Sequence, residues 1–260
     1  MNTLEALYRL TVRHLLTTYD LKPALFISLL IPNLMYIGIA AFAYNAIVTP
    51  FEIGDRVVNY ISFLIPGIIL IQIVSLSSLG GAMFWTDKHS GMLEQLFSFP
   101  FPRSYYFLTR MLAILASNLA TGFVLLVIGL PLIFDSIVLQ PYSIPLLLGS
   151  MTACSLLFGF LSMLIYFYAK TPDRVTVFTR LFTTPLIIAS SVFYPIEYAP
   201  SPIKEICYLN PLSYCANLLR ASLFGTLSLI DVWGGFALFL LTVVIIIGTR
   251  LHFERVQLKE

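Results

Sequence analysis

Histidine and cysteine are well suited to metal or nucleophilic chemistry, and the chain contains three of each. His14, His89 and His252 are far apart in the sequence, and none has a second histidine at the short spacing of a helical metal site. No residue stands in a pattern that pairs a nucleophile with its base. The chain also lacks the GxxxxGK[ST] motif, whose backbone cradles nucleotide phosphates. The sequence therefore predicts no catalytic residue, no metal site and no cofactor in this chain.

The three cysteines fall in different surroundings. Cys154 lies inside an apolar stretch and is best interpreted as a small packing residue. Cys207 and Cys215 are eight residues apart, which on one helix is about 12 Å, too far for a disulfide. Pro211 interrupts such a helix, so that a turn could bring the two thiols together. The sequence leaves this disulfide open.

The positions of the basic residues organise the whole chain. Twelve of the fifteen Lys and Arg residues fall in four segments, three in each, that alternate with pairs of apolar stretches. They are Arg9, Arg13 and Lys22; Lys88, Arg103 and Arg110; Lys170, Arg174 and Arg180; and Arg250, Arg255 and Lys259. Cationic segments stay in the cytoplasm during membrane insertion. The pattern predicts a multi-pass protein of the inner or plasma membrane with both termini in the cytoplasm.

Composition supports this interpretation. The chain is 58% hydrophobic and 11% charged, whereas a soluble domain has about 25% charged residues. Six stretches approach the ~20 apolar residues that a spanning helix needs; they are 24–48, 60–84, 111–134, 143–168, 181–195 and 230–249. The net charge is only +2, so nothing indicates a nucleic acid partner. We expect a single all-α membrane domain, 1–260, with six transmembrane helices.

Two further segments are expected to lie on the membrane or fold back into it. Apolar residues recur at helical spacing over 3–18, with Arg9 and Arg13 on another face. This predicts an interfacial amphipathic helix within 1–22, bound to lipid headgroups. The segment 195–229 is too apolar for a solvated loop, and a helix beginning at Asn210–Pro211 and ending near Gly225 is too short to span. We expect it to form outer re-entrant helices.

Two motifs in these segments resemble those of one family, the type-2 ATP-binding-cassette (ABC) exporter permeases. In the cytoplasmic loop 85–110, GMLEQLFSFP is similar to the family's G-T-L-E-Q-L-x-x-x-P. The matching residues are Gly91, Leu93, Glu94, Gln95, Leu96 and Pro100, with Met92 in place of a smaller residue. The second match is an F-x-P turn followed by N-P-L-[ST]-Y, carried by Phe193, Pro195, Asn210, Pro211, Leu212, Ser213, Tyr214 and Arg220.

The resemblance implies a fold like that of type V ABC exporters, and half of a transporter. Two permeases, usually identical, pair in the membrane, and a separate ATPase subunit binds ATP and Mg²⁺. A coupling helix would dock on that ATPase through Asp87, Gly91, Met92, Leu93, Glu94, Gln95, Leu96 and Phe97. Its apolar anchor would be formed by Met92, Leu93, Leu96 and Phe97, and its polar contact by Glu94 and Gln95. Arg9 and Arg13 would belong to a lever at the membrane surface. Phe193, Pro195, Asn210, Pro211, Tyr214 and Arg220 would form an outer gate.

The cargo is less defined by the sequence. The spans carry no acidic or basic residue at mid-depth, which disfavours a secondary transporter driven by ions. A membrane enzyme is disfavoured because no acids or histidines cluster at one membrane face. Gln72, Ser75 and Ser78 are candidates to line a pathway, although polar residues in spans also bond neighbouring helices. An uncharged pathway suits an amphiphile such as a drug, a lipid or a lipid-linked glycan.

Overall fold

The computed structural model describes residues 3–20, 23–53, 56–97, 104–169 and 171–256. Lys22, Pro100, Arg103, Lys170 and Lys259, which were part of the sequence interpretation, lie outside these residues. The elements of the first half are α1 (Thr3–Asp20), α2 (Pro23–Met35), the π-helical η1 (Tyr36–Ala40), α3 (Ala41–Ile47), β1 (Phe51–Ile53), β2 (Arg56–Val58), α4 (Tyr60–His89), α5 (Met92–Phe97) and α6 (Ser104–Ile133). Those of the second half are η2 (Phe134–Ser136), α7 (Ser143–Phe167), α8 (Pro172–Ile188), η3 (Ile196–Tyr198), α9 (Ile203–Leu209), α10 (Pro211–Phe224) and α11 (Leu229–Val256).

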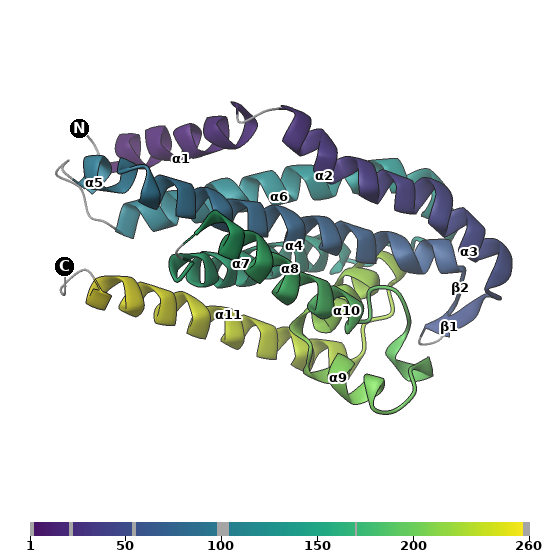
Figure 1. Cartoon of the computed structure of the whole chain (residues 1–260). Helices are drawn as coiled ribbons and strands as arrows, with labels where there is room; N and C mark the ends of the chain where they lie inside the picture. Colours follow the sequence, from purple (N-terminus) through teal and green to yellow (C-terminus); the bar gives the residue numbers. More distant parts are fainter. Residues whose placement is uncertain (1–2, 21–22, 54–55, 98–103, 170, 257–260) are drawn as a thin grey trace.

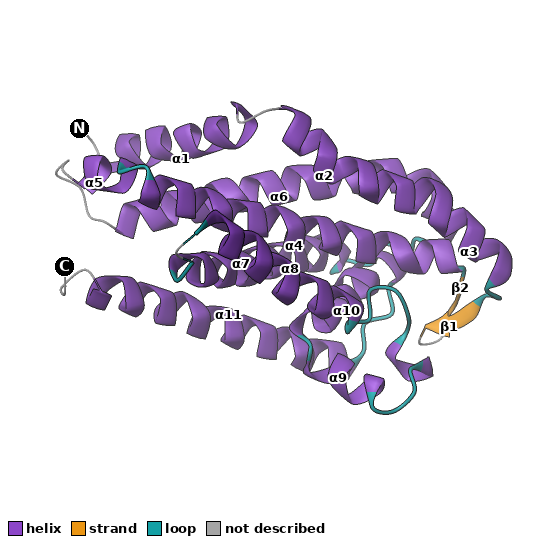
Figure 2. Cartoon of the chain, viewed as in Figure 1, coloured by secondary structure: helices purple, strands orange, loops and turns teal. Residues whose placement is uncertain are grey.

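The architecture is a bundle of long helices with one small strand pair at an end (Figures 1 and 2). In the described part of the chain, five helical stretches are long and apolar enough to cross a membrane: Leu30–Ile47, Tyr60–His89, Tyr105–Ser136, Ser143–Phe167 and Leu229–Gly248. Strands β1 and β2 form a short antiparallel hairpin, which the sequence interpretation did not include. The protein is therefore a mostly helical multi-pass membrane protein.

Helix α4 lies at the centre of the bundle. It contacts α6, α7, α8 and α10, and most of its length is buried. Close approach is possible because glycines face its neighbours; a Cβ on Gly81 would lie only 2.4 Å from the ring of Tyr166 on α7. Asn118 on α6 donates to Ser77 at 2.9 Å and to Ser155 on α7 at 2.7 Å. These polar bonds join three helices where no water competes.

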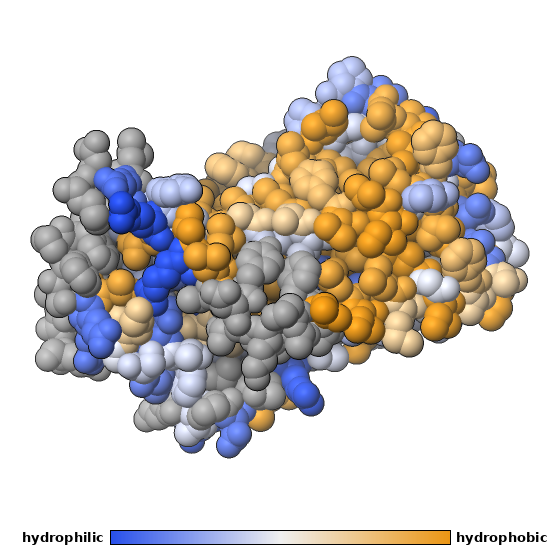
Figure 3. Space-filling view, turned by 90° about the horizontal axis from the view of Figure 1, so that it is seen from above, coloured by the Kyte–Doolittle hydropathy of each residue, from blue (hydrophilic) through white to orange (hydrophobic). Residues whose placement is uncertain are grey.

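The outer surface of the bundle is apolar. Large hydrophobic side chains on α2, α3, α6, α8 and α11 are exposed. Figure 3 shows hydrophobic side chains over a broad area of the surface, with hydrophilic side chains mainly toward the ends. A soluble protein rarely exposes so large an apolar patch. The surface is suited to hydrocarbon, as the composition predicted.

The expected fifth span, 181–195, does not match the helix that the structure places there. Helix α8 begins at Pro172 and ends at Ile188, and it has 17 residues. Its start is set by Thr171, whose hydroxyl accepts from the backbone N–H of Arg174 at 3.4 Å. The sequence interpretation placed Arg174 and Arg180 between two spans, but the structure includes both in the helix. Charge marks the edge of an apolar stretch, and a helix can continue beyond that edge.

Candidate functional site

Helix α5 lies at the end of the bundle that also holds both chain termini (Figure 1). Gly91 allows the chain to turn from α4 into α5 because it adopts a φ of +73°, which favours glycine. Glu94 and Gln95 are exposed, whereas Leu93 and Leu96 are only 9% and 8% exposed. The leucines pack against Phe84 and other apolar residues of the same chain. The apolar anchor expected for a partner is therefore directed into the protein itself, and the polar face is the accessible one.

Asp87 was expected in the same docking helix but belongs to the last turns of α4. Its carboxylate accepts a hydrogen bond of 2.6 Å from the hydroxyl of Tyr106 on α6. Tyr106 is fully buried. The predicted loop 85–110 is thus largely helical, because α4 continues to His89 and α6 begins at Ser104. Asp87 fixes the α4–α6 hairpin that carries α5.

Helix α1 is amphipathic as predicted, but the side chain that it buries completely, among those the structure describes, is the polar His14. The Nη1 atom of Arg110 on α6 lies 3.2 Å from His14 Nδ1. Since arginine can only donate, His14 accepts in this bond. Arg9 pairs with Glu5 at 2.7 Å on the exposed face, and Arg13 is half-buried. The sequence interpretation missed the contact between His14 and Arg110. Its only signal in the sequence was a basic residue, Arg110, next to the apolar stretch 111–134.

His14 is held neutral by its surroundings. Burial is the main cause that lowers the pKa of His14 to about 3, and the positive charges of Arg110 and Arg13 contribute to the same shift. A histidine in an unfolded chain has a pKa near 6.5. Below that pH the histidine is protonated in the unfolded state but not in the folded state. The free energy of unfolding therefore decreases as the pH falls.

We therefore expect the protein to lose about 2 kcal/mol of stability between pH 7 and pH 5 through this one side chain. Thermal unfolding in detergent at the two pH values measures the loss. His14→Gln can still accept from Arg110 but does not titrate, so its midpoint should fall less than that of the wild type. An equal fall in both proteins would contradict the buried, neutral state of His14.

At the other end of the bundle, Asn210 joins two helices. Its Oδ1 accepts from the backbone N–H of Leu212 at 3.0 Å, which caps the start of α10. Its Nδ2 donates to the carbonyls of Leu186 and Ala189, at 2.7 and 2.8 Å, where α8 ends. Helix α10 then ends at Gly225, whose φ is +68°. The predicted limits of this short helix are confirmed.

Arg220 on α10 is a buried cation at this end of the bundle, with 3% of its surface exposed. Its Nε donates to the carbonyl of Phe63 at 3.2 Å, and its Nη2 donates to that of Val192 at 3.0 Å. The guanidinium carbon also lies 3.5 Å from the centroid of the Phe63 ring. The side chain thus ties α10 to the start of α4 and to the turn after α8.

The other predicted outer residues surround this junction. The carbonyl of Phe193 accepts a hydrogen bond of 3.0 Å from the hydroxyl of Tyr60 on α4, and Pro195 directly precedes the short helix η3. Tyr214 donates to the carbonyl of Tyr208 at 2.8 Å. Its ring lies so close to α11 that a Cβ on Gly234 would be 2.3 Å away. The motif residues therefore share one packed region, with Pro211 as the first residue of α10.

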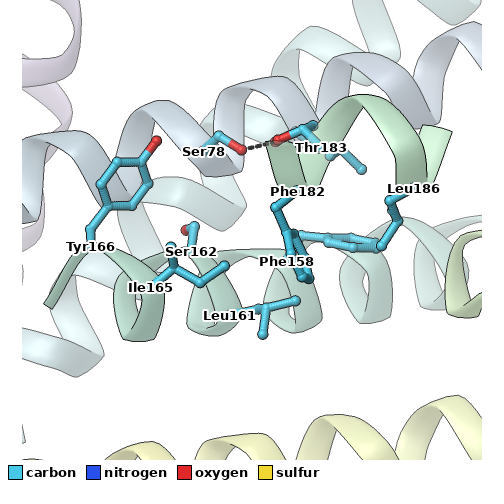
Figure 4. A pocket seen from close by; sticks show the side chains of 10 residues that line it. Ser78, Phe158, Leu161, Ser162, Ile165, Tyr166, Phe182, Thr183 and Leu186 are labelled. Atoms are coloured by element: carbon cyan, nitrogen blue, oxygen red, sulfur yellow. Dashed lines mark hydrogen bonds between the residues drawn. The ribbon is translucent and has the colours of Figure 1, made fainter. Parts of the chain in front are cut away.

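The candidate pathway residues differ in their surroundings. Gln72 is buried and accepts a hydrogen bond from Asn33 on α2, which is the helix-packing role. Ser75 is partly exposed. Ser78 lines a pocket between α4, α7 and α8, where it and Thr183 point toward each other (Figure 4). The pocket has a volume of about 20 Å³, room for about one water molecule.

All three cysteines are buried free thiols. Cys207 and Cys215 lie on successive helices, α9 and α10, without a bond between them. Among the described residues, no group of three or more His, Cys, Asp and Glu could hold a metal ion.

Comparison with known proteins gives the family. The sequence model of the ABC-2 type transporter family matches residues 5–224. The daunorubicin resistance ABC transporter permease protein DrrB1 of Streptomyces coeruleorubidus is 26% identical over 186 residues, which cover 69% of this chain and 63% of the relative. The inner membrane transport permease YadH of Escherichia coli K12 is 25% identical over 186 residues, covering 69% and 70%.

A third relative, the putative transport permease ycf38 of Cyanophora paradoxa, is 23% identical over 212 residues, or 80% of this chain and 71% of its own length. The chain spans somewhat less than two thirds of the daunorubicin relative. The family match nevertheless covers most of the chain, including both motifs. The chain therefore belongs to the ABC-2 type transporter family, as the two motifs predicted, and is a transmembrane permease of an ABC transporter.

Proposed function

We propose that this permease is the membrane half of an ATP-driven exporter, powered by a separate cytoplasmic ATPase subunit. The observation that carries the proposal is the exposed polar face of α5, formed by Glu94 and Gln95, at the end of the bundle that holds both termini. The leucines of α5 are used to hold it on the chain's own core. A helix fixed in this way can transmit a push from a bound ATPase to α4 and α6.

In this proposal the docking end is cytoplasmic and the chain crosses the membrane six times. Five crossings would leave the termini on opposite sides, whereas both lie at one end (Figure 1). Helix α8 supplies the sixth crossing. Its 17 residues reach about 26 Å, which is slightly less than the ~30 Å hydrocarbon core.

The substrate pathway is proposed to lie between two copies of the permease rather than within one. The pocket beside Ser78 and Thr183 is too small for a drug or lipid. It lies between α4, α7 and α8, and α4 and α8 correspond to the second and fifth of the six predicted apolar stretches. Apolar side chains on α8, including Val177, Leu181 and Ile188, are exposed, and a second copy would cover part of them.

We propose an amphiphilic substrate, which is a drug, a lipid or a lipid-linked glycan. The name of the Streptomyces relative refers to resistance to daunorubicin, and the pocket side chains are mostly apolar. At the outer end, α10 would close the pathway. It has 14 residues and is buried along most of its length, which suits a re-entrant helix packed against protein.

The docking face is tested by Glu94→Lys in a permease co-expressed with its ATPase. Because this change reverses a charge on an exposed face, we expect about a tenfold loss of co-purified ATPase, with little change in the unfolding temperature. Leu96→Asp should instead lower the unfolding temperature, because it places a charge in the core. The amount of co-purified ATPase is measured on blots and divided by the amount of recovered permease.

Glu52→Lys is the matched control. Glu52 is also exposed, but it lies on β1 at the opposite end. It should leave co-purification unchanged. Equal recovery of the ATPase with Glu94→Lys and with Glu52→Lys would overturn the docking role of α5.

A further inference from the structure

The contact between α1 and α6 contains two guanidinium groups that each have a buried nitrogen without a hydrogen-bond partner. Arg110 is 2% exposed. Its Nη1 meets His14 at 3.2 Å and its Nη2 meets the carbonyl of Gly80 at 3.4 Å, but its Nε has no partner. Nη1 of Arg13 is likewise buried without one. A buried, unpaired polar group in a native structure calls for an explanation, and an unseen ion is a recognised one.

The chain itself offsets only part of the positive charge of this site. His14 is neutral and contributes no negative charge. The carboxylate of Asp87, which accepts a hydrogen bond from Tyr106, acts electrostatically on Arg110 and supplies one negative charge against two positive ones. Among the described residues neither arginine has an ion pair with an acid. Arg13 and Arg110 both act electrostatically on His14 and on each other, so they lie near one another, and guanidinium groups offer the forked donors that suit a phosphate group.

From these contacts we infer that Arg13 and Arg110 bind the phosphate of an anionic lipid headgroup between α1 and α6. The depth is appropriate, because the apolar stretch of α6 begins at Tyr105 and Arg110 follows it by about 8 Å along the helix. Tyr8 and Leu16 on α1 are 71% and 53% exposed. They provide apolar surface for an acyl chain, which a free phosphate would not use.

This lipid site does not depend on the proposed transport function. It would fix α1 against the hairpin that carries α5 whatever cargo the permease moves. Its failure and that of the docking proposal are separable, since one is read from lipid binding and the other from ATPase recovery.

The experiment measures lipid retention by the full-length permease in detergent. Phosphatidylglycerol, phosphatidylcholine or inorganic phosphate is added, and bound ligand is counted by native mass spectrometry alongside the unfolding temperature. We expect phosphatidylglycerol to bind and stabilise the wild type. Arg13→Gln should weaken binding by about tenfold, the value of one charge-assisted contact, and Arg110→Gln should weaken it at least as much.

Arg9→Gln is the matched control, because it removes the same charge from α1 at an exposed position paired with Glu5. It should bind phosphatidylglycerol as the wild type does. Arg13 is only half-buried, so Arg13→Gln should leave the fold intact. This variant therefore tests the lipid site even if Arg110→Gln fails to fold. Stabilisation by inorganic phosphate equal to that by the lipid would support an oxyanion site but overturn its assignment to a headgroup. Equal lipid binding by Arg9→Gln, Arg13→Gln and the wild type, or none by the wild type, would overturn the site.

Discussion

Replacing Arg220 by glutamine should destabilise the permease by about 3 kcal/mol or more, because the buried carbonyls of Phe63 and Val192 would lose their donors. The packing of the guanidinium on the Phe63 ring would be lost as well. For a chain of this size the unfolding temperature should fall by roughly 6–12 °C. Fluorescence-detected unfolding of the purified protein measures this shift.

Arg220→Lys separates charge from geometry. Lysine keeps the positive charge, but its single ammonium group cannot bond the carbonyls of Phe63 and Val192 and the hydroxyl of Ser191 at the same time, as the planar guanidinium does. It should therefore recover only part of the lost stability. Lys204→Ala, which removes a partly exposed cation from α9 at the same end, should change the midpoint by no more than about 2 °C. If Arg220→Gln behaved like Lys204→Ala, the junction of α10 with α4 would not depend on the guanidinium.

The elements that sequence predicted well are those set by local chemistry. The limits of α10 follow from Asn210, Pro211 and Gly225, each of which acts on the backbone within a few residues. The start of α4 at Tyr60 agrees with the expected span. Cap and turn preferences need no knowledge of distant contacts, so they can be inferred from one sequence.

The elements that sequence predicted poorly depend on contacts between distant residues. His14 and Arg110 are 96 positions apart, and nothing near either residue indicates that they meet. The pattern of α5 correctly separated an apolar face from a polar one, but Leu93 and Leu96 are covered by their own chain. An amphipathic pattern identifies the face to be buried and leaves open which surface buries it.

The helix limits that the sequence predicted near charged residues were wrong for a related physical reason. Arg110 was assigned to a cytoplasmic loop, since an isolated charge in a membrane helix is costly. In the structure, contact with α1 and with the carbonyl of Gly80 makes that position tolerable inside α6. Hydropathy averages over a window and cannot detect such a contact.

Replacing Asn210 by aspartate should destabilise the protein strongly, although the two side chains are almost the same size. Asparagine and aspartate are about equally good at the start of a helix, and the bond from Leu212 can be kept. The two donors to Leu186 and Ala189 would be lost, and a carboxylate would face those carbonyls at a position 7% exposed. We expect a loss of about 3 kcal/mol or more, measured as a fall in the unfolding temperature.

Asn59→Asp makes the same chemical change at an exposed position before α4, where the side chain makes no cap bond. It should shift stability by no more than about 0.5 kcal/mol. Similar effects of the two substitutions would mean that Asn210 acts only as a helix cap. A much larger effect at Asn210 would mean that the motif asparagine joins the end of α8 to the start of α10. In that case α8 and α10 cannot separate without breaking its bonds, and a movement of α8 would carry α10 with it.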